Sequence, residues 1–252
     1  MSIYKNIQNS ISKGEKLLAV LIDPDKFSVK NTQPFIEKVN KSIATHIFVG
    51  GSIVNEDSTE YLVTEIKKHT NLPLVLFPGD VTQITGKADA LLFLSLLSGR
   101  NPAYLIGKHV EAVSKLRNTN LEVIPTGYIL IESGKETAVQ QVTETKPMSR
   151  NNIQVIVDTA IAGQLLGLKL IYLEAGSGAN EALSQSIIEE VKQALDIPLI
   201  VGGGVKSKIQ LDNAYKSGAD LVVIGTAFED NELFFDEIKS PLSSGYFPEG
   251  EK

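Results

Sequence analysis

Short runs of Val, Ile and Leu recur along the chain, and this recurrence constrains the fold more than any other feature. Most runs are apolar on both faces and lack polar alternation, which is typical of parallel strands that are covered on both sides. The eight candidate strands are residues 17–22, 46–49, 74–77, 90–94, 122–124 with 128–131, 170–173, 199–201 and 221–224.

Segments with helical spacing of apolar residues lie between these runs. In residues 32–41, for example, Phe35, Ile36 and Val39 share one helical face. The same pattern predicts helices over residues 58–69, 103–116, 153–168, 181–195 and 206–217. Pro73 and Pro198 each precede a candidate strand, where they disfavour continuation of the helix before them.

Eight strands alternating with helices over 252 residues predict a (β/α)8 barrel, the TIM barrel, which typically takes about 250 residues. A doubly wound open sheet is the structural rival, but no early strand is followed by a Gly-x-Gly-x-x-Gly fingerprint. We therefore expect one α/β domain over residues 1–252. Its third unit is irregular, because only residues 80–88 separate two strands. The polar segment 133–148 is expected to form a mobile flap at the barrel mouth, and residues 240–252 a weakly ordered tail or an oligomer contact.

Composition excludes several classes of function. With 24 basic and 30 acidic residues the net charge is −6, which argues against nucleic-acid binding. The chain has no Cys, and its three His are not closely paired, so thiolate chemistry and a histidine-rich zinc site are not expected. The first 14 residues lack the apolar core of a signal peptide, and no apolar stretch is long enough to span a bilayer. These features predict a cytoplasmic protein.

Small residues follow the last three predicted strands. In a parallel barrel, function collects where the strands end, and the loops after strands seven and eight are a recurrent phosphate site. If each loop opens a helix, free N–H groups and the helix dipole would favour an anion. Tight turns without a ligand are the structural alternative. The three segments are Leu173-Glu174-Ala175-Gly176-Ser177-Gly178-Ala179, Val201-Gly202-Gly203-Gly204-Val205 and Ile224-Gly225-Thr226-Ala227.

Three further side chains near strand ends suggest chemistry. Asp23 directly follows the first strand and could ligate a divalent cation, whereas Asp25 is interpreted as a turn residue. Ser52 follows two glycines after the second strand, and its hydroxyl could reach a metal or a phosphate. Glu174 is the one acid at the end of the sixth strand and could accept a proton from a bound hydroxyl, although capping or ion pairing would also explain it.

Ordered motifs across nearly the whole chain resemble the family of geranylgeranylglyceryl phosphate synthase and its bacterial prenylglyceryl phosphate synthase relatives. Two segments carry most of the specificity, Tyr-Leu-Glu-Ala-Gly-Ser-Gly-Ala at 172–179 and Leu-Leu-Ser-Gly-Arg-Asn-Pro at 96–102. The others are Leu-Ile-Asp-Pro-Asp-Lys at 21–26, Val-Gly-Gly-Ser at 49–52, Phe-Pro-Gly at 77–79, Pro-Thr-Gly-Tyr at 125–128, Val-Gly-Gly-Gly-Val at 201–205 and Gly-Thr-Ala-Phe-Glu at 225–229.

The resemblance implies a TIM barrel that joins a polyprenyl diphosphate to the 3-hydroxyl of sn-glycerol 1-phosphate and releases diphosphate. It implies Mg²⁺ held by Asp23 and Ser52, and Glu174 as the base. Leu21 stands where some relatives carry a lysine. Together with the Glu-Ala-Gly-Ser-Gly segment, this leucine resembles the pattern of the archaeal-type branch, whose usual donor is geranylgeranyl diphosphate. Barrels of this family associate, so a homo-oligomer is expected. The implied glycerol 1-phosphate residues are Tyr172, Leu173, Glu174, Ala175, Gly176, Ser177, Gly178, Gly203, Gly204, Gly225 and Thr226.

A prenyl tail needs an apolar groove rather than polar contacts. Candidate lining residues, for which core packing is the equal alternative, are Phe77, Leu94, Leu97, Tyr104 and Tyr128.

Two other functions use the same loops. A sugar-phosphate isomerase or an indole-type lyase would share the phosphate site but would not need Asp23 and Ser52 for a metal. A noncatalytic module that binds phosphorylated metabolites would leave Glu174 and Asp23 unexplained. Strict Mg²⁺ dependence with a prenyl diphosphate would favour the prenyltransferase over both.

Overall fold

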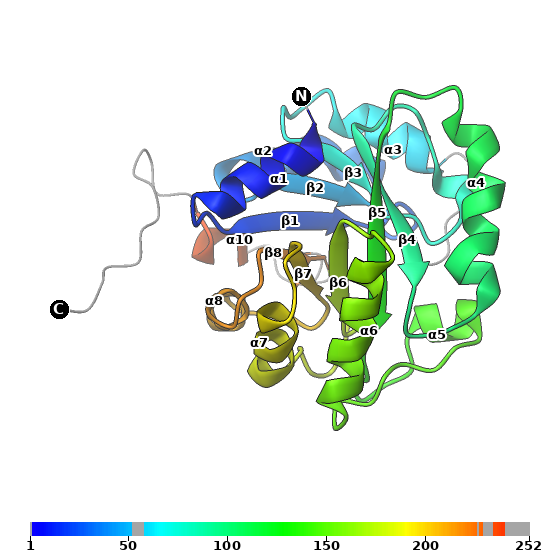
Figure 1. Ribbon diagram of the computed structural model, residues 1–252. Coiled ribbons are helices and arrows are strands. Elements are labelled where there is room, and N and C mark those ends of the chain that lie inside the picture. The colour runs from blue at the N-terminus through cyan, green and yellow to red at the C-terminus, as the bar shows by residue number, and fades with distance from the viewer. Residues whose placement is uncertain (1, 52–57, 226, 229–233, 240–252) are drawn as a thin grey trace.

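A closed barrel of parallel strands, paired in sequence order from β1 to β8, forms the centre of the computed structural model (Figure 1). The structure describes residues 2–51, 58–225, 227–228 and 234–239. Pairing of Leu17 with Leu221 and of Val20 with Ile224 joins β1 to β8 and closes the barrel. The predicted TIM barrel is confirmed. Its strands are β1 (Leu17–Ile22), β2 (His46–Val49), β3 (Leu74–Leu76), β4 (Ala90–Leu96), β5 (Glu122–Leu130), β6 (Leu170–Glu174), β7 (Leu199–Gly202) and β8 (Leu221–Ile224).

Helices surround the strands and bury their apolar faces against the outside of the barrel (Figure 1). The predicted helices are all present, with shorter ends where a side chain caps the first turn: Ser184 caps α7 and Ser207 caps α8. Residues 103–107 form a π-helical turn, η3 (Ala103–Gly107), which leads into α4. The helices are α2 (Thr32–Lys41), α3 (Ser58–Ile66), α4 (Lys108–Leu116), α6 (Ile153–Leu165), α7 (Gln185–Gln193), α8 (Lys208–Lys216) and α10 (Phe234–Glu237), with the 3-10 turn η1 (Val29–Asn31) before α2.

A helix that the apolar runs did not predict, α1 (Ile3–Ser12), lies beside the amino end of the barrel (Figure 1). Ile3 and Ile7 are buried in the same cluster as the inward-facing residues Leu17 and Phe48, so α1 packs against the barrel interior. Its first N–H groups are satisfied from far along the chain, because the Glu122 carboxylate accepts hydrogen bonds from the backbone of Ile3 and, at 3.1 Å, of Tyr4.

The third unit has the predicted irregularity. Between β3 and β4 the described chain forms only one short 3-10 turn, η2 (Val81–Gln83), which Asp80 caps through its side chain. This connection therefore adds no α-helix of its own to the outer layer, and residues such as Val81 and Ile84 line the cavity at the mouth.

The segment 133–148, predicted as a flap, contains the short helix α5 (Ala138–Thr143) with a Thr137–Gln140 capping box. A bridge between Ile131 and Met148 ties its two ends together. The tail at 240–252 lies outside the described residues. Within the described part, no helix has the length and apolar character to cross a membrane.

Candidate active site

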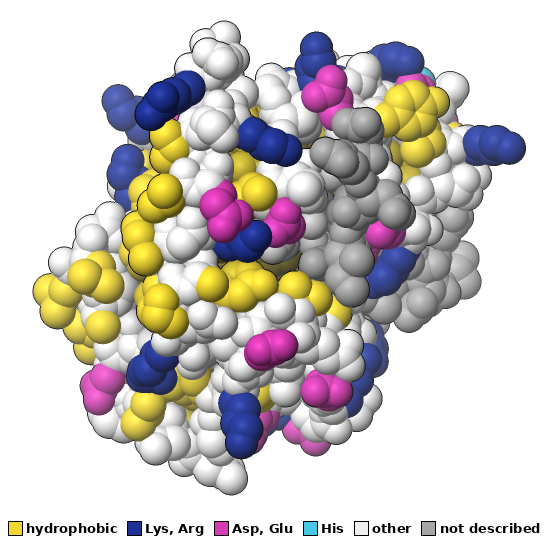
Figure 2. Space-filling model, turned by 90° about the vertical axis from the view of Figure 1, so that its right-hand side faces the viewer, with side chains coloured by type: hydrophobic (Ala, Val, Ile, Leu, Met, Phe, Trp, Pro, Cys, Tyr) yellow, Lys and Arg dark blue, Asp and Glu magenta, His cyan; other side chains and the backbone are white. Residues whose placement is uncertain are grey.

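A cavity of about 350 Å³ opens at the mouth, the carboxyl end of the barrel. Figure 2 looks into this end and shows an apolar hollow surrounded by charged side chains. Asp23 and Gly51 reach it from the first two strands, Gly225 reaches it from β8 beside β1, and Glu174 and Ser177 reach it from β6. The topology thus brings together residues from loops that are far apart in the sequence, as the strand-end argument predicted.

Glycines with left-handed backbone line one wall of the cavity. Gly178, Gly203 and Gly204 have φ values of +62°, +81° and +74°. Successive N–H groups in such conformations form anion-binding concavities. We expected the β6 loop to lead directly into a helix, but α7 begins only at Gln185. In this loop the anion-binding geometry would therefore come from the glycine backbone and not from a helix terminus.

The β7 glycines also make room for two β6 side chains, which sequence reasoning missed. A Cβ atom on Gly202 would lie 2.4 Å from Tyr172 Oη and 2.6 Å from Glu174 Oε2. A Cβ atom on Gly203 would lie 2.3 Å from Glu174 Oε1. Larger residues at these two positions would displace Glu174, the proposed base.

Glu174 ends β6 and is only 6% exposed. Its Oε1 accepts a hydrogen bond of 2.6 Å from the Gly176 N–H. Burial raises the pKa of Glu174 to about 7, against the opposing influence of Tyr172 and the Gly176 N–H. A carboxyl group with a pKa near neutrality suits proton transfer at physiological pH.

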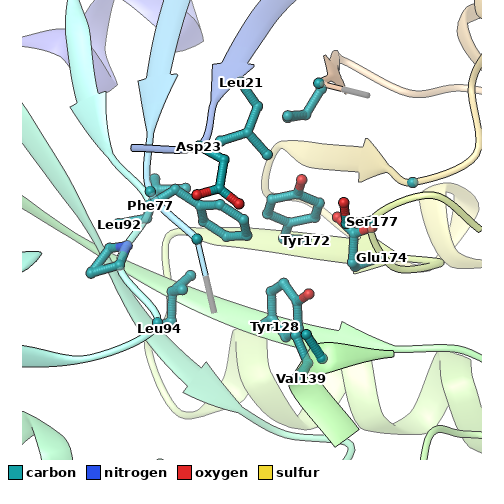
Figure 3. A pocket seen from close by; sticks show the side chains of 18 of the residues that line it. Leu21, Asp23, Phe77, Leu92, Leu94, Tyr128, Val139, Tyr172, Glu174 and Ser177 are labelled. Atoms are coloured by element: carbon teal, nitrogen blue, oxygen red, sulfur yellow. The ribbon is translucent and has the colours of Figure 1, made fainter. Parts of the chain in front are cut away.

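Tyr172 lies beside Glu174 and also faces the cavity (Figure 3). Its buried hydroxyl makes no hydrogen bond of ordinary geometry with the described residues. It is nevertheless close enough to the Glu174 carboxylate for each group to affect the other's pKa. A ligand hydroxyl beside Glu174 Oε2 would give this buried group a partner.

Asp23 faces Glu174 across the cavity, with the Phe77 and Tyr172 rings between them (Figure 3). Its carboxylate accepts a hydrogen bond of 3.1 Å from the Asp25 N–H and lies 3.3 Å from Lys26 Nζ. The turn thus uses the Asp23 side chain, a role that the sequence interpretation gave to Asp25. With a side chain 17% exposed, Asp23 can still offer an oxygen to a cation in the cavity.

The predicted metal ligand Ser52 lies outside the described residues. Among those that are described, no three His, Asp or Glu side chains gather as a metal site would require. A single carboxylate still fits Mg²⁺, which keeps several waters and takes further oxygens from substrate phosphates.

The residues predicted to hold glycerol 1-phosphate divide into two groups. Leu173, Ala175 and Gly176 do not line the cavity: the first two belong to the core outside the barrel, and the third acts through its N–H on Glu174. Thr226 lies outside the described residues. The residues that do line the cavity are Tyr172, Glu174, Ser177, Gly178, Gly203, Gly204 and Gly225.

An apolar channel continues from these polar groups. Phe77, Leu94, Tyr104 and Tyr128 line it as predicted, but Leu97 does not. Leu97 instead packs in the outer core against α6, because side chains alternate along the strand and the preceding Leu96 faces the interior. Leu21 also lines the cavity, so an apolar side chain occupies the place of the lysine in some relatives.

Sequence reasoning missed several lining residues because their elements approach the mouth only in the folded chain. Val139 and Val142 of α5 cover one side of the channel. His109 of α4 lies in the wall, where Ser95 contacts its Nε2 at 3.2 Å and burial lowers its pKa. His46, in contrast, is buried away from the cavity beside Thr45, as expected of a structural residue.

Comparison with known proteins agrees with this geometry. The profile of the PcrB family matches residues 10–242. Geranylgeranylglyceryl phosphate synthase of Flavobacterium johnsoniae is 54% identical over 235 residues, which cover 93% of this chain and 97% of that protein. The protein of the same name from Zunongwangia profunda is 57% identical over 219 residues, which cover 87% and 93%.

A solved structure is similar throughout. The crystal structure of (S)-3-O-geranylgeranylglyceryl phosphate synthase from Thermoplasma acidophilum, in complex with its substrate sn-glycerol-1-phosphate, superposes with a TM-score of 0.88 at 30% identity. The match covers 94% of this chain and 96% of that one. The fold and these relatives define a TIM-barrel enzyme, a prenyltransferase. The chain belongs to the PcrB family, which confirms the resemblance seen in the sequence motifs.

Proposed function

We propose that this enzyme transfers a prenyl group from a prenyl diphosphate, with geranylgeranyl as the expected donor, to the 3-hydroxyl of sn-glycerol 1-phosphate. One observation carries the proposal: the buried carboxyl group of Glu174 lies between a glycine-lined wall and an apolar channel. A phosphate site, a proton acceptor and a tail site thus meet in one cavity. The similar proteins described above are geranylgeranylglyceryl phosphate synthases, whose name states a product of this class.

The acceptor half of the reaction follows from the β6 and β7 loops. The glycine wall would hold the phosphate through backbone N–H groups, and the glycerol would extend toward Glu174. Because Oε1 already accepts the Gly176 N–H, Oε2 is the oxygen available to take the proton of the 3-hydroxyl. The adjacent Tyr172 hydroxyl would then orient the same substrate oxygen.

The donor half uses the opposite side of the mouth. The prenyl tail would lie among Phe77, Leu94 and Tyr104, and its diphosphate beside Asp23. We propose that Asp23 and Ser52 hold Mg²⁺, which would neutralise the charge that develops on the leaving diphosphate. The new bond joins C1 of the prenyl group to the glycerol oxygen. The bond from C1 to the diphosphate breaks, and the hydroxyl proton moves to Glu174.

A magnesium titration of two variants tests this division of roles. Asp23→Asn should lose activity and recover part of it at high Mg²⁺, because the remaining oxygens still form a weak site. Glu174→Gln cannot take the proton, so it should lose about 10²–10⁴ in rate without recovery. Product is measured by mass detection with sn-glycerol 1-phosphate and a ladder of prenyl diphosphates. If Mg²⁺ rescues both variants equally, Glu174 belongs to the metal site and the assigned base is wrong.

We also propose that the chain forms at least a dimer and acts in the cytoplasm. Ile106, Val110 and Val113 form an exposed apolar stripe along η3 and α4, which supports association. Light scattering during size exclusion would measure the mass directly. A monomer at micromolar concentration would contradict the proposed association.

A further inference from the structure

One buried polar side chain near the mouth has no part in the function proposed above. Gln83 belongs to η2, the short turn in place of an outer helix in the third barrel unit, and it is 2% exposed. Its carboxamide Nε2 donates a hydrogen bond of 2.7 Å to the backbone oxygen of Gly51. Its Oε1 accepts from the N–H groups of Gly51, at 3.4 Å, and of Gly79, at 3.3 Å. A single side chain therefore joins the β2 loop to the β3 loop.

The segment that Gln83 holds has no side chains of its own to fix it. Gly50 fits closely against the first residue after β3, since a Cβ atom there would lie 1.9 Å from the backbone oxygen of Phe77. Gly51 fits closely against the Asp23 side chain, since its Cβ atom would lie 2.7 Å from Asp23 Oδ1. The two glycines thus lie between Phe77 and Asp23, and the Gln83 carboxamide is the side chain that fixes the Gly51 backbone on both its donor and its acceptor.

We infer that Gln83 is a positioning residue for the diphosphate side of the active site. By holding Gly51 in place, Gln83 keeps the backbone that packs against the Asp23 carboxylate and so keeps Asp23 facing the cavity. This inference rests on the proposed function, in which Asp23 serves the diphosphate. The side-chain hydrogen bonds of Gln83 go to Gly51 and Gly79 and not to the glycine wall at β6 and β7, so its effect should be confined to one of the two substrates.

Calorimetric binding of two unreactive ligands tests the inference. The probes are geranyl S-thiolodiphosphate with Mg²⁺, which reports the donor side, and sn-glycerol 1-phosphate alone, which reports the acceptor side. In Gln83→Leu, three backbone groups lose their partner, and we expect binding of the diphosphate probe to weaken about tenfold. Binding of glycerol 1-phosphate should change by less than about twofold, because its wall is untouched.

Two more variants keep the test decisive. Gln83→Glu retains the two acceptor contacts but loses the donor to Gly51, so it should weaken the diphosphate probe even if the Leu variant does not fold. Gln164→Leu is the matched control. Gln164 also bonds one residue through both ends of its carboxamide, with Asp196 N at 2.9 Å and Asp196 Oδ2 at 3.2 Å, but it lies outside the cavity.

The outcomes separate the two proposals. Selective loss of the diphosphate probe in the Gln83 variants, with the Gln164 control unchanged, supports the inference. Equal weakening of both ligands, or wild-type binding by folded Gln83 variants, overturns it. If the wild-type enzyme itself fails to bind the diphosphate probe, the proposed function fails instead.

Discussion

Glu174→Gln should make the enzyme more stable at the same time as it abolishes most of its activity. In the folded chain burial raises the pKa of Glu174 to about 7, whereas the ordinary value is 4.5. Each tenfold difference in proton affinity corresponds to about 1.4 kcal/mol, so the ionised carboxylate costs up to about 3 kcal/mol of folding free energy above pH 7. Gln keeps an oxygen that can accept the Gly176 N–H but carries no charge to desolvate.

The predicted gain depends on pH, and its sign follows from proton binding. Between pH 4.5 and 7 the folded wild-type chain binds a proton that the unfolded chain has already lost, so wild-type stability falls as the pH rises. The variant lacks this group. Its advantage in the free energy of unfolding should therefore be near zero at pH 4 and should reach about 3 kcal/mol at pH 8. For a chain of this length that is about 6–12 °C in Tm.

Urea unfolding of both proteins from pH 4 to pH 8 measures this difference directly. Glu65→Gln provides a control, because Glu65 lies on the surface and its contacts with Lys68 and His69 lower its pKa. The control should bring no gain at pH 8. A stability difference between Glu174→Gln and wild type that does not change with pH would refute a buried, titrating carboxyl group at this position.

Three other predictions concern the acceptor wall and the amino end. Gly204→Val should weaken sn-glycerol 1-phosphate binding and also lower Tm, because the φ of Gly204 is +74° and a Cβ atom there would lie 2.8 Å from Ala182 N. Unchanged calorimetric binding in a folded variant would remove this loop from the site. The sn-3 enantiomer should turn over far more slowly than sn-glycerol 1-phosphate in a direct rate comparison, since phosphate and base define two fixed points; equal rates would contradict this. Glu122→Gln should lower the free energy of unfolding in urea by about 1–2 kcal/mol, because it weakens the acceptor for the first α1 N–H groups. Its kcat should stay unchanged well below Tm. An unchanged free energy of unfolding would show that this cap contributes nothing.

Much of the barrel could be predicted from local pattern. A parallel strand buried on both faces must be apolar at nearly every position, so β1, β2 and β8 could be placed to the residue. The third and fifth strands were less clear, because Phe77 extends the apolar run beyond β3 and the Pro125–Gly127 interruption lies within continuous β5. Helix α1 was missed although Ile3, Ile7 and Ile11 have helical spacing. A short amphipathic segment at a terminus does not show which part of the protein its apolar face packs against.

The sequence by itself determined the order of strands and helices, and through it which residues stand at the mouth. Parallel topology places the carboxyl end of every strand at one edge, so Asp23, Glu174 and the β7 and β8 glycines could be grouped from the sequence alone. Only the tertiary structure decided what each residue does there. Three features depend on neighbours far along the chain: the pKa of Glu174, the space that Gly202 and Gly203 leave for its side chain, and the hydrogen bonds between Gln83 and Gly51. Periodicity is a local property, whereas burial and close contact arise only when distant segments meet.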